Sequence, residues 1–384
     1  MIGLWLGTAW LCFAVALLLF IRLRLHVLDE LELTKVTQQD TAPRLSVIIP
    51  ARNEQSNIAT CLQGLLGQTY PKQALEIIVV DDGSTDETSA IVRKLMDTHS
   101  QIRLIEAGSL PEGWKGKSHA CWRGAGHAHG EWLCFMDADV TAMPELLLSA
   151  VKYAEAEDYD LFTLFPFQEM LGFWERLFMP IAFLSFLFLV DPKRINDPQK
   201  KDALAVGHFI LVKRAAYDAT GGHQTIRSEL LDDVALASRF KGEGFRIHLG
   251  SGKKLVRTRM YSDLKDLWQG LTRGATEFAG GVVVTAFTVF SSLLIGWLPV
   301  LLPCWVSQLN VEMNALSMRW LAIGAASLGS LIWLGAHAIT LRTYRIPLRY
   351  LLLLPLSYTA MTVVSLESIW RYLTGRRQWK GRMY

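Results

Sequence analysis

The sequence predicts an α/β domain with a mostly parallel sheet, held between an N-terminal membrane anchor and a C-terminal group of membrane helices. Three observations lead to this class. Short apolar runs alternate with segments of helical spacing from residue 44 to about 260, which is typical of parallel strands joined by helices. Each apolar run ends in polar or acidic residues. Long, almost uncharged stretches of about 20 residues, enough to cross a bilayer as a helix, lie near both ends of the chain.

The first long apolar stretch, residues 3–21, contains no charge and is followed by Arg22 and Arg24. A cleaved signal peptide has its basic residues before the apolar run and a small-residue cleavage site after it, and this segment has neither. We therefore expect an uncleaved anchor at 1–24 and a linker at 25–43. The basic residues that follow the run favour a catalytic domain on the cytoplasmic side of the plasma membrane.

The last third of the chain, 266–384, is predicted to be a membrane domain with two or three apolar helices and a basic tail. Its apolar stretches lie at roughly 280–306, 317–341 and 348–370. The usual charge bias would place the basic residues after the second and third stretches in the cytoplasm: Arg342, Arg345, Arg349, and then Arg376, Arg377, Lys380 and Arg382. Both groups cannot be cytoplasmic if 348–370 simply crosses. Either this stretch enters the membrane and returns, or the charge bias does not hold here.

A further apolar stretch, 172–190, lies inside the region of strands and helices. If it crossed the membrane, it would divide the candidate catalytic residues between the two sides. Glu175 and Arg176 near its start and Pro180 within it favour a helix that lies in the membrane interface. A buried core helix is the alternative.

The α/β domain is predicted at 44–265, with its site beyond the carboxyl ends of the strands, where such sheets bind ligands. Strands are expected at 44–52, 77–80, 101–107 and 132–140, with helices at 54–67 and 117–129. Ser84 and Thr85 are expected to cap the helix after the second strand. Polar residues follow three of the strands: Asn53 and Glu54, Asp81 and Asp82, and Asp137 and Asp139.

Asp137 and Asp139 follow the apolar run WLCFM. The period of a strand places both side chains on one side, with Ala138 pointing away. Two carboxylates there would repel each other unless they shared a cation, and hard oxygen ligands suit Mg²⁺ or Mn²⁺, which commonly also bind substrate phosphates. The pair therefore predicts a divalent metal site.

Asp81 and Asp82 lie at the same edge of the predicted sheet. A carboxylate there can accept the N–H group of a pyrimidine ring or a ribose hydroxyl. The alternative is a capping turn, DDGSTDE, in which Gly83 allows the tight bend. That alternative explains Asp81 less well than Ser84 or Asp86, because Asp81 directly follows the strand.

The third acidic group is Glu229, Asp232 and Asp233, just before a segment of helical spacing. Acidic residues at a helix N-terminus are stabilised by the helix dipole, by about 0.3–1 kcal/mol. Asp233 could equally be a general base that removes a proton from an acceptor hydroxyl. Spacing alone leaves both interpretations open.

Overall composition excludes some classes of protein. The net charge of +3 over 384 residues gives no indication of nucleic-acid binding. The five cysteines show no CxxC spacing, so a disulfide framework or a zinc site is not expected.

Four ordered segments, SVIIPARNE, VVDDGSTDET, GEWLCFMDADV and LLDDVALA, resemble the signature segments of the family 2 glycosyltransferases. LPEGWKGKSHACWRGA, GHFILVKRAAYDATGGH, TRMYSDLKDLWQG and the final WKGRMY resemble its membrane-bound, lipid-glycosylating branch. That branch includes the diaponeurosporenoate and hopanoid-associated glycosyltransferases and, more distantly, ceramide glucosyltransferases. The resemblance covers about residues 44–275 and the last few residues. It implies the GT-A nucleotide-diphospho-sugar transferase fold and an inverting, metal-assisted transfer of a hexosyl group from a UDP-sugar to a membrane lipid.

The resemblance also implies roles for individual residues. Pro50, Arg52 and Glu54 would line the uridine pocket, and Asp81 or Asp82 would contact the base and ribose. Lys117 would approach the nucleotide or its phosphates. Asp137 would contact the nucleotide or the donor sugar and, with Asp139, bind the metal. Asp233 would act as the general base, with Asp232 beside it. Gly207 and His208 would lie where the donor sugar and the acceptor meet. Many relatives have glutamate at the position of Asp232, and this difference keeps the charge.

Two other functions remain open from the sequence. A processive polysaccharide synthase would share the nucleotide motifs, but its Q-x-x-R-W signature is absent, since Gln269 and Arg273 have the wrong spacing. A non-catalytic nucleotide- or lipid-binding membrane protein is the second alternative, and the intact acids at every expected position argue against it.

Overall fold

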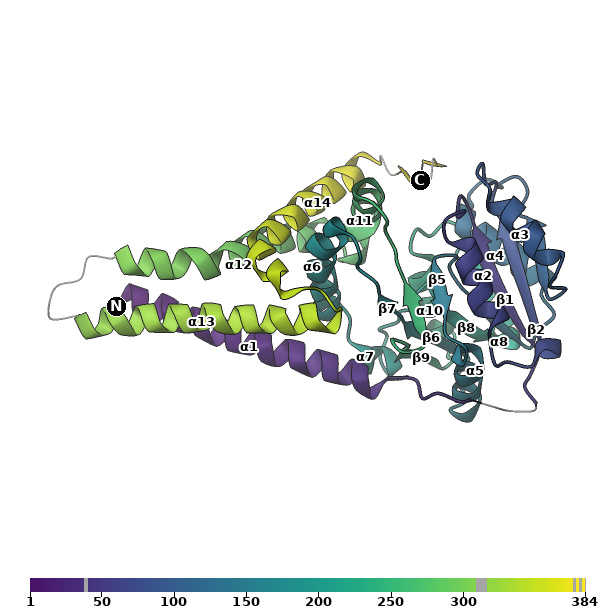
Figure 1. The fold of residues 1–384 in the computed structure, drawn as a ribbon, viewed down its shortest axis with the longest axis horizontal. Coiled ribbons are helices and arrows are strands. Elements are labelled where there is room, and N and C mark those ends of the chain that lie inside the picture. Colours follow the sequence, from purple (N-terminus) through teal and green to yellow (C-terminus); the bar gives the residue numbers. More distant parts are fainter. Residues whose placement is uncertain (38–40, 309–315, 376–377, 380–381, 384) are drawn as a thin grey trace.

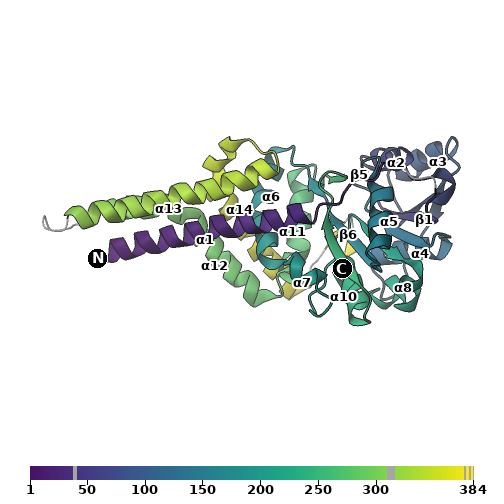
Figure 2. The same ribbon diagram turned by 90° about the horizontal axis from the view of Figure 1, so that it is seen from below.

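The structure is a computed structural model, and it describes residues 1–37, 41–308, 316–375, 378–379 and 382–383. Figure 1 shows two parts side by side: an α/β domain at one end, and long helices that extend away from it at the other. The view in Figure 2 shows the same separation.

The α/β domain is built on a seven-stranded sheet of order β3-β2-β1-β4-β8-β6-β9. Strands β1, β2, β3 and β4 are parallel to one another, β6 is parallel to β9, and β8 runs antiparallel to both β4 and β6. The bounds are β1 Leu45–Ala51, β2 Leu75–Asp81, β3 Ile102–Glu106, β4 Trp132–Phe135, β6 Leu161–Phe165, β8 Ile210–Lys213 and β9 Ile247–Ser251. The predicted mostly parallel sheet is confirmed.

Alternating side chains of the strands feed two separate cores, one on each face of the sheet. In β1, Val47 and Ile49 join one core and Ile48 joins the other, as the two-residue period of a strand requires. The first core is covered by α2 Ile58–Leu66, α3 Thr88–Met96 and α5 Leu146–Ala156. The second is covered by α4 Gly116–His127, α8 Arg214–Ala219 and α10 Asp232–Gly242. The domain is therefore a three-layer sandwich.

Smaller elements complete the domain. A second sheet of order β5-β10-β7 contains β5 Val140–Ala142, β10 Val256–Thr258 and β7 Phe167–Gln168. Short helices lie at η1 Lys72–Ala74, α7 Pro192–Asn196 and α9 Gly222–Thr225.

Two details of the predicted elements were wrong. Ser84 and Thr85 do not cap α3, whose N-cap is Glu87. The Ser84 hydroxyl accepts the Asn53 N–H and the Thr85 N–H donates to the Asn53 side chain, so both residues join two loops instead. Strand β4 ends at Phe135, so Asp137 and Asp139 lie in the turn that follows it rather than in the strand.

Within the described residues, four helical segments are long and apolar enough to cross a membrane: α1 Ile2–Glu30, α12 Val282–Gln308, α13 Leu316–Thr343 and the segment 348–374. Glycines let α1 and α13 approach closely. A Cβ atom on Gly7 would lie 2.7 Å from the carbonyl oxygen of Ala322, and one on Gly329 would lie 2.6 Å from Trp10. Small residues at such contacts are typical of helices packed in lipid.

The N-terminal helix differs from its predicted bounds. Helix α1 continues to Glu30, beyond the expected anchor at 1–24 and into the expected linker. Directly after it, Leu33 and Ser251 are joined by a backbone hydrogen bond of 2.8 Å, so the chain is fastened to the edge of the large sheet at β9. The long apolar helix is thus tied to the α/β domain.

The segment 348–374 enters the helix bundle and returns. It consists of η3 Leu348–Leu353 and α14 Leu354–Thr374. Tyr350 packs against Phe173 near the α/β domain, Tyr358 lies in the bundle core with Trp10, and Ser368 bonds helix α11 back beside the domain. Figure 1 shows α14 running obliquely toward α11. This path of the chain is the one that the first alternative describes, but the sides of the membrane on which the two basic groups lie stay a prediction. Arg376, Arg377 and Lys380 of the tail lie outside the described residues.

Two helices lie between the bundle and the α/β domain: α6 Phe173–Leu189 and α11 Leu264–Phe278. In Figure 1, α6 runs across the direction of α1 and α13 rather than along it. It packs against α11, α13 and α14. The helix predicted at 172–190 is present and much of it is buried, while its place at a membrane interface stays a prediction. The short strands β11 Gln378–Trp379 and β12 Arg382–Met383 form a hairpin, and β11 contacts α11.

Candidate active site

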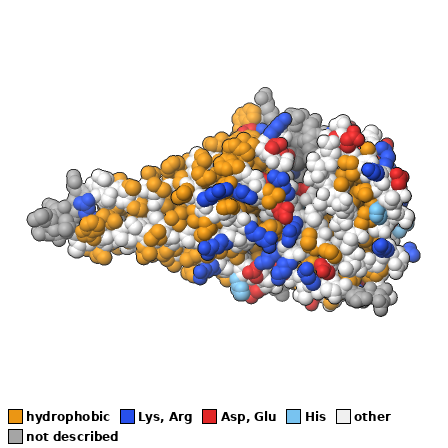
Figure 3. Space-filling model, viewed as in Figure 1, with side chains coloured by type: hydrophobic (Ala, Val, Ile, Leu, Met, Phe, Trp, Pro, Cys, Tyr) orange, Lys and Arg blue, Asp and Glu red, His pale blue; other side chains and the backbone are white. Residues whose placement is uncertain are grey.

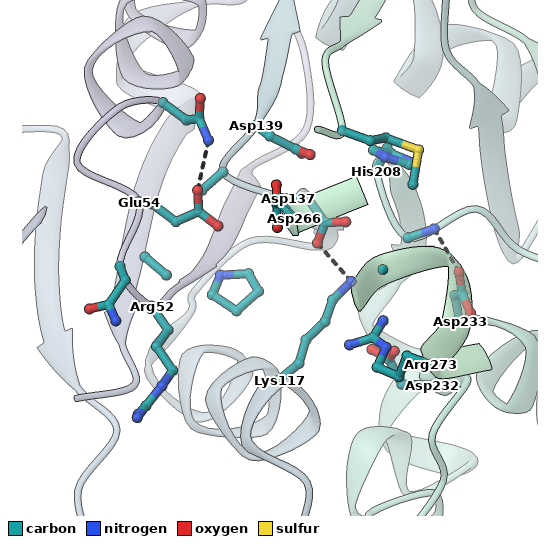
Figure 4. A pocket seen from close by; sticks show the side chains of 18 of the residues that line it. Arg52, Glu54, Lys117, Asp137, Asp139, His208, Asp232, Asp233, Asp266 and Arg273 are labelled. Carbon is teal, nitrogen blue, oxygen red and sulfur yellow. Dashed lines mark hydrogen bonds and ion pairs between the residues drawn. The ribbon is translucent and has the colours of Figure 1, made fainter. Parts of the chain in front are cut away.

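A pocket of about 700 Å³ opens between the carboxyl ends of the strands and helix α11. Of the predicted site residues, all but Asp81 line it (Figure 4): Pro50, Arg52, Glu54, Asp82, Lys117, Asp137, Asp139, Gly207, His208, Asp232 and Asp233. We call the side formed by 50–57, Asp82 and 137–139 the strand-end wall. The opposite side, formed by residues 259–273, is the membrane-side wall.

The chain turns sharply after β1 and so presents Arg52 and Glu54 to the pocket. Asn53 has a φ of 53°, a left-handed conformation in which asparagine is better tolerated than most residues. Its side chain and backbone are held by the loop after β2, as described above. Arg52 donates to the backbone oxygen of Asp82 at 2.5 Å, and Glu54 accepts from the Asn57 side chain at 2.8 Å. The two loops of this wall thus hold each other.

The two acids after β2 have different surroundings. Asp81 accepts the backbone N–H of Ser84 at 2.8 Å and the hydroxyl of Ser89. Its carboxylate therefore holds the turn together and does not line the pocket. Asp82 is 5% exposed and lines the pocket. Of the two candidates for contact with a base or ribose, Asp82 is the one whose position allows it.

Asp137, Asp139 and His208 form a group that could hold a metal ion, because one ligand atom from each lies within 4.8 Å of the others. The two acids come from the turn after β4, and His208 comes from the loop before β8. The two acids converge through this turn, in which the Val140 N–H bonds the Asp137 carbonyl oxygen, and not through strand alternation as expected. The sequence reasoning placed His208 at the sugar and did not group it with the metal.

The imidazole of His208 suits such a site. Its Nδ1 atom is buried and has no hydrogen-bond partner among the described residues. Burial lowers the pKa of His208, which favours the neutral ring that can act as a ligand. The donor set of two carboxylates and one imidazole suits Mn²⁺ as well as Mg²⁺.

Lys117, Asp137 and Asp233 converge on the backbone of Gly207. A Cβ atom there would lie 2.9 Å from Lys117 Nζ, 3.3 Å from Asp233 Oδ2 and 3.5 Å from Asp137 Oδ2. Lys117 pairs with Asp137 at 2.7 Å, and the Gly207 N–H donates to Asp233 at 3.0 Å. A Cβ atom at this position would therefore push against the charged ends of Lys117 and Asp233. The acids at 137 and 233 therefore belong to one site.

The charged groups of this cluster change one another's pKa values. Burial alone would lower the pKa of Lys117, but Asp137, Asp232 and Asp233 outweigh it and hold that pKa well above its usual value. Burial, and then repulsion from Asp232, raises the pKa of Asp233. Asp232 and Asp233 are the first two residues of α10, where the helix dipole stabilises their ionised forms. Asp233 also accepts the Val234 N–H at 2.8 Å.

The membrane-side wall contains residues that sequence reasoning did not assign to the site. Asp266, Gly270 and Arg273 lie on one face of α11, at spacings of four and three residues, and line the pocket. Figure 4 shows Asp266 and Arg273 among the side chains that line the pocket. Arg259 lines the pocket as well and is paired with the buried Glu175 of α6 at 3.0 Å. The 3–4 spacing of polar residues in this helix was the available signal.

The opposite face of α11 is bonded to α14. Trp268 Nε1 donates to Glu367 at 2.6 Å, and Thr276 bonds Ser368 at 2.9 Å. Glu367 also accepts from Arg371 at 2.8 Å. The membrane-side wall is thus held in place by a helix of the bundle.

The fold and the acidic strand-end site define a glycosyltransferase of the GT-A type. Residues 46–221 match the sequence profile of the family described as Glycosyl transferase family 2. The chain is 27% identical over 349 residues to 4,4'-diaponeurosporenoate glycosyltransferase of Staphylococcus aureus (strain USA300), and the match covers 88% of each chain. The relative of that name from strain MRSA252 is 30% identical over 246 residues, 62% of each chain. This chain therefore contains a family 2 glycosyltransferase domain at residues 46–221 and resembles the diaponeurosporenoate glycosyltransferases, as its motifs predicted.

A solved structure supports the fold over nearly the whole chain. The mannosyltransferase PcManGT from Pyrobaculum calidifontis, in complex with GDP-Man and Mn²⁺, matches with a TM-score of 0.53 and 18% identity. The match covers 97% of this chain and 99% of the other. At this identity the likeness shows the fold alone.

Proposed function

We propose that this enzyme transfers a hexosyl group from a UDP-sugar to a membrane lipid, with inversion at the anomeric carbon. The acceptor class we favour is a terpenoid lipid, such as a carotenoid or hopanoid, because the matching relatives are named for a carotenoid acid. We further propose that the catalytic domain faces the cytoplasm, at the plasma membrane.

One observation supports this proposal above all others. The acids at 137, 139 and 233 share a single pocket with Lys117, and the wall opposite them belongs to a helix bonded to the membrane bundle. Donor and acceptor could therefore meet at the boundary between the α/β domain and the lipid. A transferase with two soluble substrates would have no use for this arrangement.

Asp137, Asp139 and His208 would hold Mg²⁺ or Mn²⁺. When bound, such an ion neutralises the charge that develops on the departing diphosphate, which is worth several kcal/mol. Lys117 brings a further positive charge to the same place, beside Asp137. Arg52, Glu54 and Asp82 would hold the uridine part on the strand-end wall.

Asp233 is the proposed general base. The backbone N–H groups of Gly207 and Val234 hold its carboxylate in place. The raised pKa of Asp233 makes it a stronger base than an exposed aspartate, although it is ionised only above that raised value. It would remove the proton of an acceptor hydroxyl as the oxygen attacks the anomeric carbon. A single displacement on the face opposite the leaving group inverts that carbon. An acceptor carboxylate would need no such proton transfer.

The test uses membranes that contain the full-length protein. They are incubated with labelled UDP-glucose, other UDP-sugars and GDP-mannose in the presence of Mg²⁺ or Mn²⁺, together with lipid extracts that contain carotenoids and hopanoids. Mass spectrometry of the lipid fraction is expected to show one added hexose with a UDP-sugar.

The control is the Asp139→Asn variant, which lacks a proposed metal ligand and is expected to be inactive. Label that appears only in a water-soluble ladder of products would overturn the proposal in favour of a polysaccharide synthase. Transfer from GDP-mannose alone would overturn the choice of donor.

A further inference from the structure

The loop that ends α13 presents three arginines on the surface beside the α/β domain. Arg342, Arg345 and Arg349 are exposed, whereas Tyr344 and Ile346 between them are buried. Leu341, Tyr344, Ile346 and Tyr350 join a core shared with α6. Tyr344 stacks on Phe183 at 5.2 Å. The buried residues thus fix the loop, and the arginines all point outward from it.

Arg345 occupies a backbone position that favours glycine. The Ile346 N–H bonds the Leu341 carbonyl oxygen at 2.8 Å, and the Arg345 N–H bonds the Arg342 carbonyl oxygen at 3.0 Å. These two bonds form the Schellman motif that often ends helices, with its left-handed residue at 345. Arg345 has a φ of 57° there. A charged residue that accepts this backbone cost points to a use for its side chain.

The three guanidinium groups have no acidic partner among the residues that the structure describes. Glu169 and Glu175, which are near in sequence to the aromatic residues around this loop, pair with Arg257 and Arg259 instead. Arg345 lies over the ring of Phe167 at 5.0 Å, which holds it but leaves its charge uncompensated. A surface with this charge attracts anionic groups.

Exposed apolar residues surround the arginines. Phe173 and Trp174 at the start of α6 are 47% and 41% exposed, and Leu348 and Leu352 of η3 are 39% and 85% exposed. Large apolar side chains beside arginines are typical of the boundary between the acyl chains and the headgroups of a bilayer. In Figure 3, Lys and Arg side chains gather in a band between the tapering hydrophobic part and the α/β domain, at the level where α13 ends.

We propose that Arg342, Arg345 and Arg349 bind the phosphate groups of acidic phospholipids. Guanidinium groups bind phosphate oxygens in pairs of hydrogen bonds, and the neighbouring apolar residues would contact the acyl chains. A net negative headgroup is required, because a zwitterionic one carries its own compensating cation. The site is separate from the pocket and does not depend on the proposed donor or acceptor.

The experiment measures lipid binding rather than transfer. The full-length protein in detergent micelles receives equal amounts of phosphatidylglycerol and phosphatidylcholine, and native mass spectrometry counts the lipids retained. The wild-type protein is expected to retain phosphatidylglycerol preferentially. Replacing the three arginines by glutamine is expected to reduce that preference by about tenfold or more. Arg342→Lys, Arg345→Lys and Arg349→Lys together are expected to preserve most of it, because the charge remains.

Arg44→Gln, Lys72→Gln and Lys94→Gln provide the matched control, since they remove three exposed charges from the α/β domain. That protein is expected to bind as the wild type does. The proposal is overturned if the control loses the preference equally, if the glutamine variant keeps it, or if the lysine variant loses it completely. It is also overturned if inorganic phosphate at the lipid concentration displaces the phosphatidylglycerol, since that would identify a site for free phosphate.

Discussion

The two walls of the pocket are built in different ways. The strand-end wall consists of short loops that leave parallel strands, and its residues are held by bonds within and between those loops. The membrane-side wall consists of one face of α11 and the loop before it, and α11 is positioned by bonds to α14. The first wall depends on the local chain and the second on tertiary contacts with the bundle. Substitutions in the two walls should therefore act differently.

The largest effect is expected for the base, which lies between the walls. Asp233→Asn removes the proton acceptor and is expected to lower kcat by about 10²–10⁴-fold while UDP-sugar binding is kept. Transfer rate and UDP affinity are measured separately, with the exposed Asp218→Asn as the control. Transfer that persists at the wild-type rate would exclude Asp233 as the base.

The same residue predicts a pH dependence. Since burial and then Asp232 raise the pKa of Asp233, activity should fall on the acid side at a pH above the usual aspartate range near 3.8. A carboxyl whose pKa is higher in the folded protein than in the unfolded chain adds stability at low pH, and this is lost as the pH rises through the raised value. Asp233→Asn cannot titrate and keeps only one of the two backbone hydrogen bonds that the carboxylate accepts, so its melting temperature can differ in level but should lose this pH-dependent fall. A variant whose melting temperature falls with rising pH as steeply as that of the wild type would contradict the direction of the pKa shift.

A smaller effect is expected where the walls meet. Gly207→Ala places a Cβ atom 2.9 Å from Lys117 Nζ and 3.3 Å from Asp233. We expect kcat/KM to fall by about 10–100-fold, because the charged groups must shift out of position. Gly126→Ala is the matched control, since its Cβ atom meets nothing within 4 Å. Equal activity of the two variants would show that the cluster is not required as it stands.

The sequence predicts the strand-end wall better than the membrane-side wall. The residues of the strand-end wall could be predicted from the sequence because short motifs follow buried strands, and the order of the strands brings those motifs together. Even there, only the structure separates Asp81, which holds a turn, from Asp82, which faces the pocket. It also shows that Asp137 and Asp139 converge through a turn. The groups on α11 were only partly predictable: their 3–4 spacing puts Asp266 and Arg273 on one face of a helix, but nothing local shows that this face returns to the sheet. The path of α14 back toward the α/β domain likewise depends on packing contacts, which cannot be predicted from hydropathy alone.

The membrane-side wall is tested directly by Arg273→Gln. The side chain lines the same pocket as Asp232 (Figure 4). Loss of an interaction with a charged group there is expected to lower kcat/KM by about tenfold. Lys265→Gln removes an exposed charge from the same helix outside the pocket and should have no effect. An equal loss in both variants would mean that α11 contributes only through its overall charge.

The smallest effect, and the sharpest test of the comparison, is expected outside the pocket. Trp268→Phe removes the 2.6 Å hydrogen bond to Glu367 but keeps the aromatic ring, so α11 loses one of its bonds to α14. We expect a decrease in kcat/KM of about threefold, with UDP affinity unchanged, because the strand-end wall does not depend on this bond. Trp297→Phe is the matched control, since it removes a similar 3.1 Å bond between α12 and α14 without touching α11. If Trp268→Phe weakened UDP binding as much as transfer, the two walls would not be independent, because a bond to the bundle would then hold the nucleotide side as well.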